Sequence, residues 1–263
     1  MPTLQNNTHT SPSTLNGVVV ILLFDFLPQY RSWAWLRLVQ GTNHFYKTLP
    51  GLLFAKVMGS GEDGGFGLRP SSTHQGLIFV FDGIKNATNY LNSSELLFYQ
   101  EKAREWWQGL MAVNSCRGSW TNQSWASSSV LDKAPPAEHL GPVASLTRGS
   151  IRATKAVSFW RYAPPAQIDL EQAQGCQLAI GLGEAPLLRQ CTFSLWSNTQ
   201  ALIDYAHQGA HQRAIAAAKK HSFFTESMFV RMQVLHMRGQ WKGRQFNSTS
   251  RVFEENAIDA HTA

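Results

Sequence analysis

A short motif occurs twice in this chain, and the repeat restricts the possible folds more than any other feature. Arg117-Gly118-Ser119-Trp120 is followed by Trp125, and Arg238-Gly239-Gln240-Trp241 is followed by Phe246. Each copy comes after the same order of predicted strands and helices. Because self-similarity along a chain indicates a repeated substructure, we expect two similar halves within the 263 residues.

Each half has the pattern β-α-β-β-α-β, read from apolar and β-branched runs for strands and from helical spacing of apolar residues for helices. In the first half we expect strands at 17–26, 52–58, 77–82 and 109–116, a helix at 33–47 and a broken helix at 85–107. In the second half we expect strands at 142–151, 177–182, 188–196 and 229–237, a short helix from 156 and a broken helix at 199–220. This is the order of a ferredoxin-like unit, and the predicted fold class is α+β.

Two ferredoxin-like units commonly pair sheet to sheet, since each exposes one face of its sheet. We therefore predict a fold like a dimeric α/β barrel within one chain, with a pocket for an apolar ligand between sheet and helices. The expected boundaries are 17–125 for the first half, 126–140 for a linker rich in Ser, Ala and Pro, and 141–246 for the second half. The ends at 1–16 and 247–263 are predicted to be flexible.

Composition limits the partners and the location. Lys and Arg give a net charge of +6 but form no dense run, so nucleic acid is not expected as a partner. Cys116, Cys176 and Cys191 are odd in number and lack metal-ligand spacing, which fits a reducing compartment. No secretion signal or membrane-spanning run is visible, and we expect a cytoplasmic protein.

One histidine stands out in the second half. Gly209 interrupts a helical pattern, and His211 opens the next one with Ala214, Ile215 and Ala218 on its face. Such a smooth face suits either a structural histidine packed on a sheet or the approach of a flat ring such as haem. A third interpretation, non-haem iron bound by Asp204, His207 and His211, requires an unbroken helix through Gly209.

The two halves differ at this point. Aligning Phe79-Val80-Phe81-Asp82 with Phe193-Ser194-Leu195-Trp196 places His211 opposite Leu97, so only the second half carries an imidazole there. This asymmetry is expected if one half holds a cofactor, and sequence drift would also produce it.

Several ordered blocks resemble one known family. They are Leu49-Pro50-Gly51-Leu52 with Lys56, Gly59-Ser60-Gly61, Gly65-Phe66 with Pro70, Gly141-Pro142-Val143-Ala144-Ser145-Leu146-Thr147-Arg148, Gly181-Leu182-Gly183-Glu184-Ala185-Pro186-Leu187-Leu188-Arg189-Gln190, Thr192-Phe193-Ser194-Leu195-Trp196, and Gly209-Ala210-His211 with Ala214-Ile215. These blocks resemble the spheroidene monooxygenase family, the acyclic carotenoid 2-ketolases. Ala210 stands where the pattern has Pro, and Phe81 where it has Trp, which leaves the substrate open.

The resemblance implies a monooxygenase that uses haem b, O2 and reduced ferredoxin to place a keto group on an acyclic carotenoid such as spheroidene, by successive hydroxylations. The cysteine signature of thiolate-ligated P450 haem is absent, which leaves a histidine as axial ligand. His211 is the expected ligand, ahead of His207, His221 and His236. Arg69, Arg148 and Arg189 are candidates to contact a haem propionate or are ordinary surface charges. No distal catalytic residue is assigned.

Other functions remain open at this point. One is another haem enzyme, such as a dehydratase, or a cofactor-free oxygenase of the α/β-barrel type. Another is a non-enzymatic carrier of haem or of an apolar ligand. Because a carotenoid dissolves in the bilayer and the net charge is positive, we also expect peripheral contact with membranes.

Overall fold

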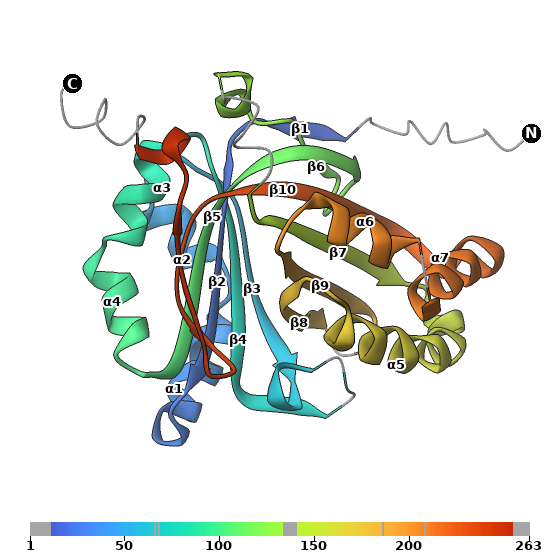
Figure 1. The fold of residues 1–263 in the computed structure, drawn as a ribbon. Helices are drawn as coiled ribbons and strands as arrows, with labels where there is room; N and C mark the ends of the chain where they lie inside the picture. The colour runs from blue at the N-terminus through green and yellow to red at the C-terminus, as the bar shows by residue number, and fades with distance from the viewer. Residues whose placement is uncertain are drawn as a thin grey trace, which may run out of the picture.

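The computed structural model describes residues 12–65, 67, 69–133, 141–185, 187–207 and 209–254 (Figure 1). The strands are β1 Ser13–Leu15, β2 Val18–Phe26, β3 Leu52–Gly61, β4 Pro70–Phe81, β5 Ala103–Gly118, β6 Gln123–Trp125, β7 Val143–Ile151, β8 Cys176–Ala185, β9 Arg189–Trp196, β10 Phe224–Trp241 and β11 Arg244–Thr249. The helices are α1 Arg31–Gln40, α2 Asn43–Thr48, α3 Ile84–Leu91, α4 Ser94–Gln100, α5 Ala156–Gln172, α6 Thr199–Ala206 and α7 Gly209–His221.

An antiparallel barrel forms the centre of the molecule. Nine strands hydrogen-bond in the order β11-β10-β5-β2-β4-β3-β8-β9-β7, and β10 also pairs with β7. This last pairing closes the sheet on itself, with β11 left outside as a partner of β10 only. Closure satisfies the strand edges that an open sheet would expose. The predicted α+β class is confirmed, with an antiparallel barrel as its centre.

The two sets of four barrel strands have the same order, β5-β2-β4-β3 and β10-β7-β9-β8. Their registers also correspond. Val18 at the start of β2 pairs with Phe81 and Ala112, and Val143 at the start of β7 pairs with Trp196 and Gln233. Positions in the two halves can therefore be compared strand by strand.

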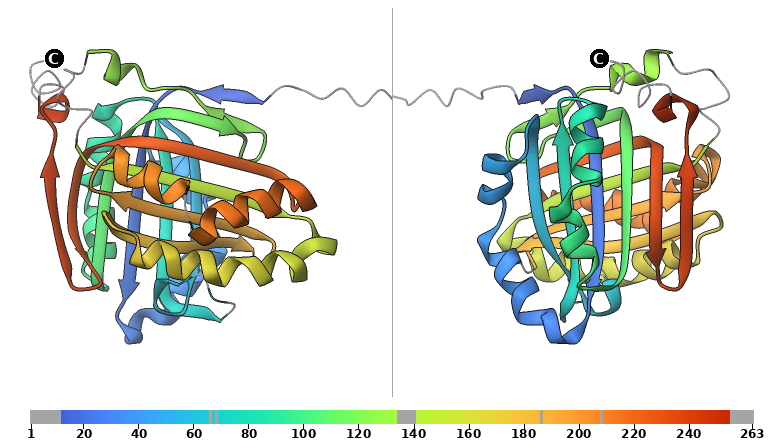
Figure 2. Two further views of the ribbon diagram at one scale, coloured as in Figure 1. Left: turned by 45° about the vertical axis from the view of Figure 1, so that its right-hand side comes forward. Right: turned by 90° about the vertical axis from the view of Figure 1, so that its left-hand side faces the viewer.

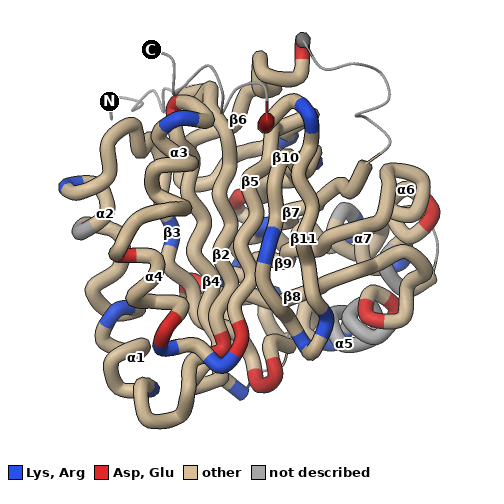
Figure 3. The backbone as a smooth tube through the Cα atoms, turned by 60° about the vertical axis from the view of Figure 1, so that its left-hand side comes forward, with Lys and Arg blue, Asp and Glu red and all other residues tan. Residues whose placement is uncertain are grey.

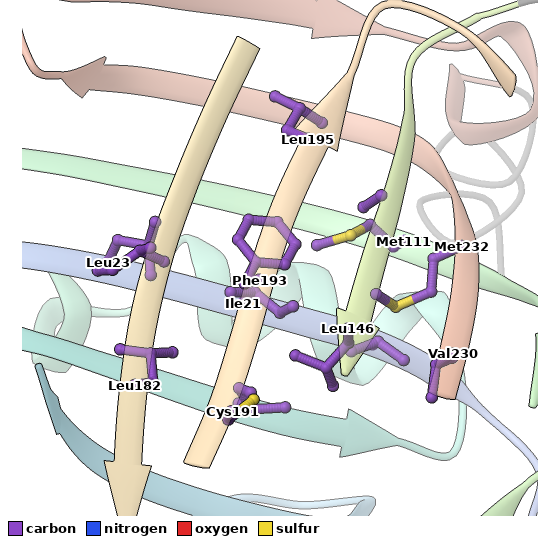
Figure 4. Packing of buried hydrophobic residues seen from close by; sticks show 14 of the residues in the cluster. Ile21, Leu23, Met111, Leu146, Leu182, Cys191, Phe193, Leu195, Val230 and Met232 are labelled. Atoms are coloured by element: carbon purple, nitrogen blue, oxygen red, sulfur yellow. The ribbon is translucent and has the colours of Figure 1, made fainter. Parts of the chain in front are cut away.

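The barrel interior is filled by apolar side chains (Figure 4). In β2 the alternate residues Val19, Ile21 and Leu23 face inward, with Met111 of the neighbouring strand β5 beside them and Phe193 of β9 packing in the same cluster. Because successive residues of a strand point to opposite faces, Val20 and Leu22 face outward under the helices. All these side chains are at most 1% exposed, so the interior is a packed core.

Helices cover the outside of the barrel in two groups. The helices α1, α2, α3 and α4 lie against the first half, and α5, α6 and α7 lie on the outer side of the second-half strands (Figure 2). The break predicted in the last helix is confirmed, because α6 ends at Ala206 and α7 begins at Gly209, whose φ is +61°. None of the helices that the structure describes combines the length and apolar character that a membrane span requires.

One helix prediction was wrong at its end. We expected helix up to Trp107, but the chain turns at Glu101 and β5 starts at Ala103. Trp107 faces the barrel interior at 0% exposure and pairs with Leu23 of β2. Apolar residues at helical spacing misled the sequence interpretation, since the tertiary pairing with β2 overrides local propensity.

Parts of both predicted end segments lie in β-strands. Ser13–Leu15 form β1, which pairs in parallel with β6, and Asn247 to Thr249 extend β11. Both additions cover neighbouring strands, because Leu15 packs against the interior cluster and Phe246 belongs to it. The rest of the predicted ends, at 1–11 and 255–263, and the predicted linker from 134 to 140 lie outside the described residues.

Candidate functional site

The outer face of the second-half sheet is built from small residues. Val143 and Trp196 face the helices, as their cluster with Leu170 of α5 and Leu202 of α6 shows. By strand alternation the same face carries Ser145, Thr147, Gly149, Gly181, Gly183, Thr192 and Ser194. These seven residues form a floor under α5, α6 and α7, and we refer to them as the small-residue floor.

The equivalent face of the first half carries large apolar side chains. Counting from Val18 and Val143, Val20 corresponds to Ser145 and Leu22 to Thr147. By the strand pairings, Leu77 corresponds in the same way to Thr192, Phe79 to Ser194 and Val57 to Gly181. Val20, Leu22 and Leu77 are 0% exposed, whereas Ser145, Thr147 and Thr192 are half-buried. The second-half helices therefore do not close onto their sheet as the first-half helices do.

Two aromatic clusters hold the helices at either end of the small-residue floor. At one end Phe159 of α5 lies 5.8 Å from Phe223 and 5.7 Å from Phe224, ring centre to ring centre. At the other end Trp196 lies 5.1 Å from Tyr205 of α6. Between these clusters Ser145, Thr147, Gly183 and Thr192 of the floor are half-buried, whereas Gly149, Gly181 and Ser194 are buried.

His211 is the third residue of α7. Its side chain lies outside the described part of the chain, but the position has a counterpart in the first half. In the first half β4 ends at Phe81, α3 begins at Ile84 and α4 begins at Ser94. In the second half β9 ends at Trp196, α6 begins at Thr199 and α7 begins at Gly209, at the same spacings. The residue opposite His211 is therefore Leu96, the third residue of α4.

This corrects the sequence alignment that placed Leu97 opposite His211. The alignment matched Phe79, which faces the helices, with Phe193, which faces the interior. A shift of one residue moves every side chain to the other face of the sheet. The difference matters, because Leu96 is 1% exposed and packs toward the sheet, whereas Leu97 is 50% exposed.

The other three histidines have separate environments. His207 is exposed and follows the last turn of α6. His221 stacks on Phe223, with ring centres 5.4 Å apart. His236 lies on β10, with Nδ1 3.0 Å from the Thr249 hydroxyl, and burial lowers its pKa, with a further contribution from Arg238.

The non-haem iron alternative finds no support in the described side chains. The break at Gly209 separates His207 from α7, and the Asp204 carboxylate accepts a hydrogen bond from Gln200 at 2.7 Å.

The three arginines proposed for a propionate lie apart. Arg69 is exposed between β3 and β4. Arg189 is exposed at the start of β9, two residues before the inward-facing Cys191, and therefore lies on the same side of that strand as Cys191. Arg148 is buried within the barrel and does not face the floor.

Sequence reasoning missed Arg231, which is exposed and pairs with Ser145, on the same face as the floor. Strand register across β7 and β10 is the signal that identifies it.

Arg148 belongs to a buried charge cluster that joins both halves. Its guanidinium is 2% exposed and lies 2.5 Å from Glu226 and 3.2 Å from Glu184. The Lys56 ammonium of β3 lies 2.9 Å from the other oxygen of Glu184, and the Trp120 indole donates to Glu184 at 3.2 Å. Lys56, Arg148 and Glu184 come from three separate blocks of the family resemblance, which the closed barrel brings together.

Both carboxylates of this cluster have lowered pKa values. Burial alone would raise the pKa of Glu184, but the hydrogen bond and charge of Lys56, with Arg148 and Trp120, hold it below its usual range. Burial would likewise raise the pKa of Glu226, and the Asn122 amide and Arg148 lower it. Both carboxylates are therefore charged at neutral pH.

We expect this cluster to make stability sensitive to acid. A carboxyl whose pKa is lowered on folding stabilises the protein at pH values above its pKa in the unfolded chain, here 4.5. This stabilisation is lost as the pH falls through the pKa of the folded state. Urea unfolding from neutral pH to about pH 3 should show this loss, with a smaller decline in Glu184→Gln. Equal declines in both proteins would contradict it.

Two small pockets lie elsewhere in the described residues. One of about 270 Å³ lies between α1 and β4, beside His74, and one of about 260 Å³ lies between β8 and the β10–β11 turn. Burial lowers the pKa of His74 despite the charge of Asp25, 3.7 Å away. Both volumes fall below the roughly 300–1,000 Å³ of typical small-molecule sites.

Comparison with known proteins adds to this geometry. The chain is 48% identical over 240 residues to a spheroidene monooxygenase of Rubrivivax gelatinosus, with 90% of each chain covered. It is 28% identical over 201 residues to a spheroidene monooxygenase of Cereibacter sphaeroides, covering 74% of this chain and 60% of that protein. No family model matches the sequence.

Among solved structures, an aldoxime dehydratase in complex with butyraldoxime resembles the fold. The TM-score is 0.54 at 8% identity, and the match covers 85% of this chain and 82% of the other. At that identity the likeness concerns the fold alone. It agrees with the α+β barrel described above.

Proposed function

This chain belongs to the spheroidene monooxygenase family, and we propose that it is a haem-dependent monooxygenase that introduces a keto group into an acyclic carotenoid such as spheroidene. In this proposal O2 is the oxidant and reduced ferredoxin supplies the electrons. The reaction takes place in the second half, between the small-residue floor and α7.

The single observation that carries the placement is the contrast between the two sheet faces. Leu22 and Leu77 fill the outer face of the first half, where the second half has Thr147 and Thr192. Ser, Thr and Gly leave room for a flat group between sheet and helix, and glycine allows close approach to the backbone. The residues present therefore fit a haem lying over the floor.

In this arrangement His211 would hold the iron. The position is chosen because its counterpart in the first half, Leu96, is buried against the sheet. Bound haem supplies the activation of O2. Arg231 supplies a positive charge on the floor side for a propionate, and Phe229, 44% exposed beside Thr147, offers an apolar contact to the carotenoid.

The substrate chemistry consists of two hydroxylations at one carbon. Each inserts one oxygen atom of O2 into a C–H bond and reduces the other atom to water, with electrons from ferredoxin. The resulting gem-diol loses water to give the ketone.

We further interpret the two sets of barrel strands as two ferredoxin-like β-α-β-β-α-β units within one chain. Their equal strand order and register support this interpretation. The domain limits remain those predicted, 17–125 and 141–246, joined by 126–140.

A large side chain placed on the small-residue floor should weaken haem binding without lowering the stability of the protein. We expect Thr147→Phe to weaken haem binding by about tenfold or more while stability changes little, since the new ring occupies space that is half-exposed. The matched variant is Leu22→Phe, at the equivalent and fully buried position of the first half. It should lower the unfolding free energy by roughly 1–3 kcal/mol through overpacking. Haem titration and urea unfolding measure the two effects. Equal destabilisation by both variants would show that the floor offers no room.

The proposed function is tested by an absorption spectrum of the protein supplied with haem, followed by turnover of spheroidene with reduced ferredoxin and O2. We expect a Soret band and a ketone product. A protein that turns over carotenoid without haem would refute the haem dependence. A haem-bound protein that leaves every acyclic carotenoid unchanged would refute the monooxygenase assignment.

A further inference from the structure

The solvent-facing side of α1 carries three large apolar residues beside the exposed Ser32 and Gln40. Trp35 is 62% exposed, Val39 60% and Leu36 49%, and these three residues share the outward face of one helix. The opposite face is also apolar, with Ala34 0% exposed against the sheet. A helix that is apolar on both sides is normally buried, and a contiguous apolar surface marks a site of contact.

The helix α4 beside α1 also exposes an aromatic ring. Trp33 of α1 packs edge-on against Phe98 of α4, with ring centres 5.8 Å apart, and Phe98 is itself 43% exposed. The ammonium of Lys102 lies 3.2 Å from the centre of the Phe98 ring. A cation beside exposed aromatic rings is the arrangement found where proteins meet the lipid headgroup region.

The charge of this part of the chain has one sign. Residues 28–50, which contain α1 and α2, include Arg31, Arg37 and Lys47 and no Asp or Glu (Figure 3). Arg31 and Lys47 are exposed. Basic residues around an exposed apolar helix are complementary to an anionic lipid surface, whereas a protein partner with an apolar surface alone would not require them.

We propose that the outward face of α1, formed by Trp35, Leu36 and Val39, docks on an anionic lipid bilayer, with Arg31 contacting the headgroups. The helix lies in the plane of the interface with its three apolar side chains among the acyl chains. This inference rests on the proposed function in one respect, because a carotenoid dissolved in the bilayer gives the docking surface its use.

The test compares the full-length protein with a triple variant, Trp35→Gln, Leu36→Gln and Val39→Gln. The control changes three other exposed apolar residues, by Val157→Gln, Leu187→Gln and Leu188→Gln. Each protein is sedimented with vesicles of phosphatidylcholine and phosphatidylserine, and with vesicles of phosphatidylcholine alone. We expect the α1 variant to lose about tenfold or more in partitioning to the anionic vesicles. The control should partition like the wild type.

Circular dichroism verifies that the α1 variant is folded, and sedimentation equilibrium gives the oligomeric state without lipid. The proposal is overturned if the wild type does not bind anionic vesicles, or if the α1 variant binds them equally well. It is also overturned if the wild type is a dimer that the α1 substitutions dissociate, because the face would then bind a second copy of the chain.

Turnover in two media separates this inference from the proposed function. With carotenoid in vesicles, the α1 variant should be slower than the wild type by about the loss in partitioning, and with carotenoid in detergent micelles the two should be equal. Loss of turnover in both media would overturn the docking role. If no protein oxidises a carotenoid in either medium while partitioning still depends on α1, the proposed function fails and the docking surface stands.

Discussion

We expect His211→Ala to lose haem affinity by about a hundredfold or more and, with it, the Soret band and the ketolase activity, because the variant lacks the axial imidazole. The fold should survive. Alanine is the most favourable residue in a helix, and His211 lies in the first turn of α7, so the unfolding free energy of the haem-free protein should change by less than about 1 kcal/mol.

The matched control is His207→Ala. His207 lies four residues earlier but is exposed beyond the end of α6, and the positive φ of Gly209 separates it from α7. We expect this variant to keep haem and activity. If His211→Ala retains the wild-type Soret band and ketone formation, the axial ligand is another residue. If only His207→Ala loses them, the break at Gly209 does not separate the two imidazoles in function.

The largest expected effect on stability comes from Arg148→Met. Removing this guanidinium leaves Glu184 and Glu226 without their shared partner at the centre of the buried charge cluster. An unpaired buried charge typically costs about 3–5 kcal/mol, and we expect the lower end because Glu226 is 25% exposed and Glu184 retains Lys56. Urea unfolding at neutral pH measures the loss.

The control for this prediction is Arg117→Met, since Arg117 is exposed on β5. A surface substitution of this kind should change the unfolding free energy by no more than about 0.5 kcal/mol. Arg148→Met should also regain part of its lost stability in acid, because protonation removes the unpaired carboxylate charges. A variant as stable as the wild type at neutral pH would show that the cluster contributes nothing to stability.

Sequence patterns identified much of the fold. The repeated motif and the apolar runs predicted most barrel strands, and Gly209 predicted the break before α7, which the structure confirms. These features are local, because the side-chain alternation of a strand and the φ that glycine permits are properties of a few consecutive residues.

Local patterns could not predict the register between the halves. Phe79 and Phe193 look equivalent in sequence, yet one faces the helices and the other the interior. Only the pairing of Val18 with Phe81 and of Val143 with Trp196 settles the correspondence. That correspondence places Leu96 opposite His211 and makes the small-residue floor visible.

The sequence by itself predicted most of the elements and their order, and it singled out His211 as the candidate to hold a haem. The tertiary structure decided what those elements bring together. Lys56, Arg148, Glu184 and Glu226 lie on four strands and form one cluster only because β3 pairs with β8 and β7 pairs with β10. The physical reason is that barrel closure joins residues far apart in the chain, and no local propensity or spacing encodes which strand edges meet.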